Sequence, residues 1–321
     1  MFTAGHRQRR LCNYNAGSAH CTRDRMAAFL SGISIVCFAA SYAVALACEA
    51  SRLVFRSGVR GFVMVGFAAA GLFAHTLFLI WRAVDAGTAP LSSPFDWYLL
   101  AAWLLAVGSL YLTVTNPKTP VGLFLLPIVL ALVGAATLAS REPFLNDSAS
   151  RFWGRIHGGF HLVWSVSVVL GAIAGLMWLI QAGRLTRKAA PLRGFRMPSL
   201  ERLAHVTART PAIAAWAAAA GFVSGIVLNA VNHRRGLIET VPWSDPVVLR
   251  MAAVVAWLII AERIAATVRR RPDGARTTAW LALLSLAALA ASIAWGVLGA
   301  TRHGKPAAAV VLTATVHEAE A

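Results

Sequence analysis

Long apolar segments follow one another through most of this chain, and they constrain its fold more than any other feature. Hydrophobic residues make up 58% of the sequence. Several segments run for about 20 residues with almost no charge, which is the length that crosses the hydrocarbon core of a bilayer. Backbone polar groups inside lipid pair within their own segment, so we expect the spans to be helices. The sequence therefore predicts an all-α integral membrane protein, a polytopic bundle of about eight transmembrane helices.

The expected spans form one transmembrane domain over 26–300, which leaves no room for a soluble domain of ordinary size. The spans are expected at 27–50, 60–81, 96–114, 119–139, 157–182, 211–232, 247–268 and 278–299. Residues 1–25 are basic and polar, and two readings stay open: a disordered tail, or a chain that starts at Met26. Residues 301–321 are expected to be a C-terminal tail.

The formal net charge is +17, and arginines between the apolar spans supply much of it. Basic loops beside spans are typical of contact with anionic lipid, so the charge predicts a membrane-lipid surface and no nucleic-acid partner. We expect the basic segments at 184–209 and 269–276 on the cytoplasmic side of the cell's inner membrane. The outer face then holds the loops at 82–95, 140–156 and 233–246. The basic N-terminal segment favours the opposite orientation.

Four histidines lie inside the expected spans or at their ends. His157 and His161 stand four residues apart, so a helix places both on one face. His75 lies within the second span, and His233 ends the sixth. Because neutral imidazole is a good axial ligand of haem iron, we take His157 and His75 as candidate iron ligands and His161 and His233 as further cofactor-binding candidates. The alternative for each is a hydrogen bond to a neighbouring helix or a headgroup.

Aromatic residues gather near the loops expected on the outer face, where they are typical of interface anchors or of a flat platform for a porphyrin. They are Trp81, Phe95, Trp97, Phe152, Trp153, Trp164 and Trp243. We take Trp243 and Asp245 as candidate cofactor-binding residues. The alternative for Asp245 is that it caps the seventh helix, with Pro246 in the first turn. No hydrolase, zinc-protease or phosphate-loop motif occurs, so no catalytic residue is predicted.

Three stretches resemble the membrane proteins of cytochrome c assembly of the CcsA/HemX type, which act in system II cytochrome c biogenesis. The first follows the pattern Arg–x₄–Gly–x₂–Pro–Leu–Ser from Arg82 to Ser92, with an acidic residue, Asp96, at the start of the next helix. The second is Trp153–x₃–His157. The third runs over 198–203 and resembles the cytoplasmic surface segment that precedes the next span in this family. Residues 221–229 are similar to the glycine-rich exit of that span.

This resemblance implies an eight-span protein that binds or routes haem b at the outer face, for attachment to apocytochrome c, together with other membrane subunits of that machinery. The family's tryptophan-rich loop is reduced here to Trp243, Asp245 and Pro246, and the position of a family histidine falls at Ala265. His157 matches a family ligand. An accessory assembly factor therefore fits this chain better than a synthase or a stand-alone enzyme.

Two other classes of function stay open. The first is a scaffold subunit that keeps the same fold without a ligand, as the reduced loop suggests. The second is a small-molecule transporter, which would be marked by broken helices and by charges that face a cavity within the membrane. The sequence shows few such charges and no internal repeat.

Overall fold

A computed structural model describes residues 34–51, 59–85, 91, 93–117, 119–141, 148–188, 197–234, 241–271 and 273–298. The tails expected at 1–25 and 301–321 lie outside these residues. In the described part of the chain all regular structure is helical: α2 (Ile35–Ser51), α3 (Val59–Asp85), α4 (Pro94–Thr115), α5 (Gly122–Leu138), α6 (Ser148–Thr186), α7 (Leu200–Arg234), α8 (Pro246–Val268) and α9 (Gly274–Leu298).

The predicted all-α membrane architecture is confirmed, since every expected span overlaps a described helix. Five helices are long and apolar enough to cross a membrane, namely α3, α4, α6, α7 and α9. The helices α2 and α5 are apolar but shorter. The chain therefore has the features of a multi-pass membrane protein.

The extent predicted for the loop at 184–209 is wrong, because helix α6 runs on to Thr186 and α7 already begins at Leu200. The Ser199 hydroxyl accepts the backbone N–H of Arg202 at 3.3 Å, which satisfies one donor of the first turn. Pro211 lies inside α7 and cannot donate to the Thr207 carbonyl, and the Thr210 hydroxyl points at that oxygen from 3.4 Å. The charged residues before 211 indicate where the apolar segment begins, and helix α7 extends beyond that segment to Leu200.

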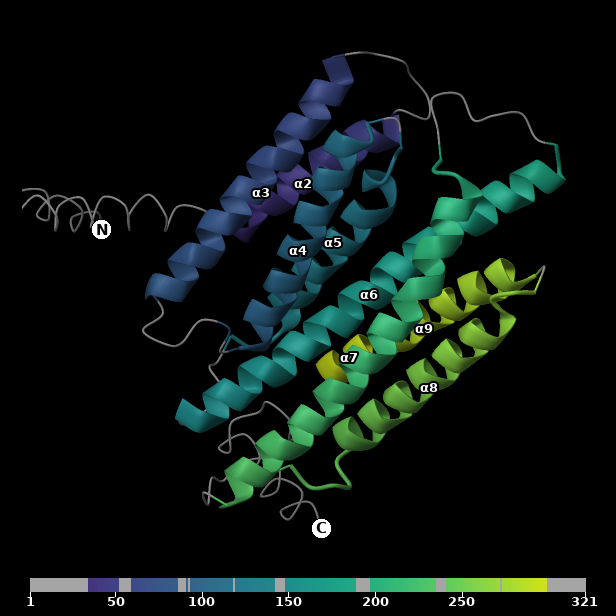
Figure 1. Cartoon of the computed structure of the whole chain (residues 1–321). Coiled ribbons are helices and arrows are strands. Elements are labelled where there is room, and N and C mark those ends of the chain that lie inside the picture. Colours follow the sequence, from purple (N-terminus) through teal and green to yellow (C-terminus); the bar gives the residue numbers. More distant parts are fainter. Residues whose placement is uncertain are drawn as a thin grey trace, which may run out of the picture.

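The helices form two groups that lie side by side (Figure 1). One group holds α2 to α5 and the other holds α6 to α9, and the contact between them lies mainly between α4 and α6. Helix α6 also packs along α7 and α9, so it is the central helix of its group. Helices α3, α5 and α7 end, and α4, α6 and α8 begin, at one end of the bundle, at the lower left of Figure 1. We call this the site end.

Glycines let α6 approach its neighbours closely, as small residues do between membrane helices. A Cβ at Gly158 would lie 2.4 Å from the Trp97 ring of α4. A Cβ at Gly175 would lie 3.1 Å from both the Cα and the carbonyl oxygen of Ala279 in α9. Because backbone atoms of α9 face Gly175, this contact has no flexible side chain that can move aside.

Replacing Gly175 with valine is expected to reduce the free energy of unfolding by about 1–3 kcal/mol, because the added branches force α6 away from α9. Gly159→Val is the matched control: it lies in the same helix, and nothing lies within 4 Å of its Cβ position. Titration of the detergent-purified protein with sodium dodecyl sulfate, followed by helical circular dichroism, measures both. Equal stability of the two variants would contradict close α6–α9 packing.

Candidate functional site

Two histidine rings meet edge to face where α6 faces α7. The ring centroids of His157 and His161 are 4.3 Å apart, with an angle of 72° between the ring planes. The predicted placement of both residues on one helical face is therefore confirmed. A Cβ at Gly221 of α7 would lie 3.3 Å from His161 Nδ1, and one at Gly225 would lie 2.8 Å from His157 Cε1. The two glycines, one turn apart on α7, make the space that the two rings occupy.

The hydrogen bonds of His157 define which ring nitrogen carries the proton. Its Nδ1 lies 2.9 Å from the carbonyl oxygen of Gly221, and a carbonyl oxygen can only accept. The Ser224 hydroxyl donates to the same carbonyl at 2.7 Å, and its oxygen lies 3.4 Å from His157 Nδ1. We infer that Nδ1 is protonated and that Nε2 carries the lone pair. This is the arrangement that orients a histidine for metal ligation, with one nitrogen held by a backbone carbonyl.

His161 has the opposite arrangement. Its Nδ1 lies 2.8 Å from the indole Nε1 of Trp164, and an indole N–H can only donate. In the neutral ring the proton is then on Nε2, which leaves no lone pair there for iron. Trp164 itself is 4% exposed, so it is part of the core and not of an outer aromatic platform. The structure thus gives His161 a packing role beside His157.

His75 lies in the other helix group, completely buried against α2. Its ring stacks on Phe38 with 4.2 Å between centroids and 1° between planes, and the Tyr42 hydroxyl lies 3.3 Å from its Nδ1. Its Nε2 has no hydrogen-bond partner among the described residues. The residue is 0% exposed, so in this packing its ring is not open to a haem. No described contact links His75 with His157, so the described residues do not bring these two candidate iron ligands together.

Replacing Tyr42 with phenylalanine is expected to reduce the free energy of unfolding by about 1 kcal/mol, because a buried hydrogen bond to His75 is lost. Tyr111→Phe is the control, since Tyr111 is 65% exposed and its loss of a hydroxyl should cost less than about 0.5 kcal/mol. The same detergent titration compares them. A stability change in Tyr42→Phe no larger than in the control would show that the His75 contact is not formed.

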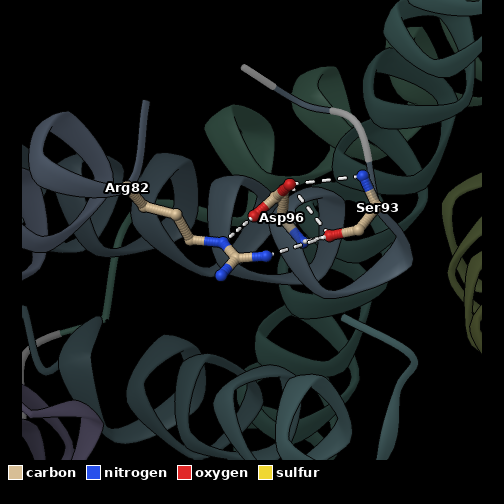
Figure 2. A network of polar contacts seen from close by, with 3 residues as sticks. All are labelled: Arg82, Ser93 and Asp96. Carbon is tan, nitrogen blue, oxygen red and sulfur yellow. Dashed lines mark hydrogen bonds and ion pairs between the residues drawn. The ribbon is translucent and has the colours of Figure 1, made fainter. Parts of the chain in front are cut away.

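Arg82, Ser93 and Asp96 form a polar network that joins the end of α3 to the start of α4 (Figure 2). Arg82 Nε donates to Asp96 Oδ1 in an ion pair, and Arg82 Nη2 lies 3.4 Å from the Ser93 hydroxyl. The Ser93 backbone N–H and hydroxyl donate to Asp96 Oδ2 at 3.2 and 2.8 Å. Ser93 and Asp96 also form a capping box for α4. The Arg82 and Asp96 that carry the family resemblance therefore have a structural role.

The loop before α8 holds the remaining candidates. Asp245 Oδ1 accepts the Val247 N–H at 2.8 Å, and Pro246 stands in the first turn, so the helix-cap alternative for Asp245 is confirmed. Trp243 is 60% exposed, and His233 is exposed on the last turn of α7. Described contacts do not bring these three residues to His157.

Three groups near this site were not predicted from the sequence as site residues. The first is the α7 face with Ser224 and Gly225, for which the four-residue glycine spacing is the available signal. The second is Asn229, whose side chain bonds both the N–H and the carbonyl of Val241 at 2.9 Å and so holds the chain after α7 in place. The third is Arg250, a charge within an otherwise apolar run.

No family model, curated protein or solved structure matches this chain. Within the described residues no group of three or more His, Cys, Asp or Glu side chains has the arrangement of a metal site. A haem differs from such a site because one or two axial side chains are enough to hold its iron. His157 has the donor chemistry that an axial ligand needs.

Proposed function

We propose that this chain binds haem b near the site end of the bundle, with Nε2 of His157 as an axial ligand of the iron. The observation that carries this proposal is the hydrogen bond between His157 Nδ1 and the Gly221 carbonyl, since it selects the tautomer whose Nε2 can ligate. When bound, haem supplies an iron centre that takes an imidazole nitrogen as its ligand.

The residues around His157 support this role by holding the ring in one orientation. Gly225 admits the ring, and Ser224 shares the carbonyl that receives its proton. Trp97 packs over Gly158, directly after His157, and adds an apolar wall. A rigid ligand in a largely apolar setting binds a flat apolar cofactor with little loss of side-chain freedom.

We propose further that the protein serves cytochrome c assembly as an accessory factor in the inner membrane, which presents haem at the outer face for attachment to apocytochrome c. The sequence resemblance supports this step, together with the placement of basic segments at the opposite end of the bundle from the site end. Its partners would be apocytochrome c and the other membrane subunits of that machinery.

A ligand-free scaffold of the same fold is the second candidate. Three observations favour it: His75 is packed into the core, His161 accepts a hydrogen bond at Nδ1, and Asp245 caps a helix. A transporter has less support, because the described part of the chain places few charges within the apolar helices.

Absorption spectra of the full chain, purified in detergent from haem-replete cells, separate these candidates. We expect a Soret band that shifts on reduction with dithionite, and stoichiometric haem b in a pyridine haemochrome assay. A protein that carries no haem, and takes up none when haem is added in detergent, would contradict haem handling and favour the scaffold.

A further inference from the structure

Arg250 lies one turn inside α8 and is half-buried, with part of its charged group covered by protein. Its Nε and Nη1 atoms are buried, and neither has a hydrogen-bond partner among the described residues. The guanidinium group keeps its charge at every physiological pH, and buried donors without an acceptor are costly. These two nitrogens are therefore available to an anionic acceptor that the described part of the chain does not supply.

The neighbours of Arg250 attract its charge, but no described hydrogen bond or ion pair joins them to its two buried nitrogens. The charged or titratable groups that interact with it electrostatically are Tyr98 of α4 and Asp245. Asp245 Oδ1 accepts from the α8 backbone, and no described ion pair joins Asp245 to Arg250. Arg82 offers the contrast at the same end of the bundle, because Asp96 and Ser93 meet its guanidinium directly (Figure 2).

Arg250 and His157 lie at the same level of the bundle. The Trp97 ring of α4 packs where a Cβ of Gly158 would stand, directly after His157. The next residue of α4 is Tyr98, the electrostatic neighbour of Arg250. The first turn of α4 therefore lies beside the His157 region and within electrostatic reach of Arg250. An anionic group that reaches Arg250 is at the depth of the candidate haem site.

We propose that Arg250, with Tyr98 beside it, is a binding site for the carboxylate or phosphate oxygens of a membrane-borne ligand. The guanidinium group pairs well with both anions. Two sources carry this chemistry: the carboxylates of haem and the phosphate of a membrane lipid. The haem source rests on the proposed function, and the lipid source does not.

The first arm of the test uses haem and its dimethyl ester, which differ only in the charge of the two carboxyl groups. Both are titrated into the full chain in detergent, for the wild type, Arg250→Gln and Arg250→Met. If the haem carboxylate is the ligand, we expect both variants to bind haem about tenfold more weakly than the wild type does. The affinity of both variants for the ester should equal that of the wild type. Arg263→Gln is the control, because Arg263 is in the same helix and its side chain is 78% exposed.

The second arm uses lipid. Thermal unfolding is measured in mixed micelles with phosphatidylglycerol or with diacylglycerol, which lacks the phosphate. If the lipid phosphate is the ligand, phosphatidylglycerol raises the unfolding midpoint of the wild type and of Arg263→Gln but not of the Arg250 variants. Met keeps an unbranched apolar stem and has neither charge nor polar donors, so Arg250→Met keeps the test possible if the glutamine variant does not fold.

The outcomes separate this inference from the proposed function. Wild-type protein that binds neither haem nor its ester contradicts the proposed function, and the lipid arm alone then decides the role of Arg250. If the Arg250 variants lose affinity for haem and for the ester equally, Arg250 has a structural role in the fold. This result overturns the inference unless phosphatidylglycerol, and not diacylglycerol, raises the unfolding midpoint in the lipid arm. Wild-type behaviour of these variants in both arms would also overturn it.

Discussion

Replacing Asp96 with alanine is expected to reduce the free energy of unfolding by about 3 kcal/mol, because one carboxylate supports two contacts at once. Its Oδ1 pairs with Arg82 across the α3–α4 connection, and its Oδ2 accepts from Ser93 at the start of α4. The side chain of Asp96 is only 10% exposed and that of Arg82 23%, so water replaces the lost partner poorly. Detergent titration followed by circular dichroism measures the change.

Two controls sharpen this prediction. Asp96→Asn keeps the shape and an acceptor oxygen for the cap but loses the charge, so its effect should lie between the wild type and alanine. Glu262→Ala removes an ion pair with Arg263, whose side chain is 78% exposed, and should cost less than about 1 kcal/mol. An Asp96→Ala protein as stable as Glu262→Ala would show that the network of Figure 2 does not hold α3 to α4.

His157→Ala is expected to weaken haem binding by more than about 100-fold, since it removes the nitrogen that ligates the iron. Haem titration of the purified variant, followed by the Soret band, measures this loss. His161→Ala should keep most of the affinity, because its Nδ1 is taken by the Trp164 indole. His205→Ala is the neutral control, since His205 is exposed near the start of α7, away from the site end. Similar affinities for His157→Ala and His205→Ala would remove His157 as the ligand.

The sequence predicted the helices well because membrane burial requires apolar length, which is visible in a single chain. It predicted the ends of α6 and α7 poorly, since hydropathy reports where lipid ends, and charged turns such as the one at Arg202 stay helical beyond that point. The cap at Ser199 is the local signal that would have placed the start of α7 correctly.

The candidate site was predictable in part. The four-residue spacing of His157 and His161 placed both rings on one face, and the Asp–Pro pair before α8 indicated a helix cap. The partner of each ring was not predictable, because His157 bonds a backbone carbonyl 64 residues away in the chain. The core position of His75 depends on Phe38 of another helix, which a single sequence does not place.

The measurement that tests the central claim most directly is imidazole rescue of His157→Gly. The glycine variant removes the ligand and leaves a space for a free imidazole at the same position. We expect the purified variant to lose the spectrum of histidine-ligated haem and to regain it when imidazole is added, while His161→Gly shows neither change. A wild-type haem spectrum in His157→Gly without imidazole would contradict ligation by His157.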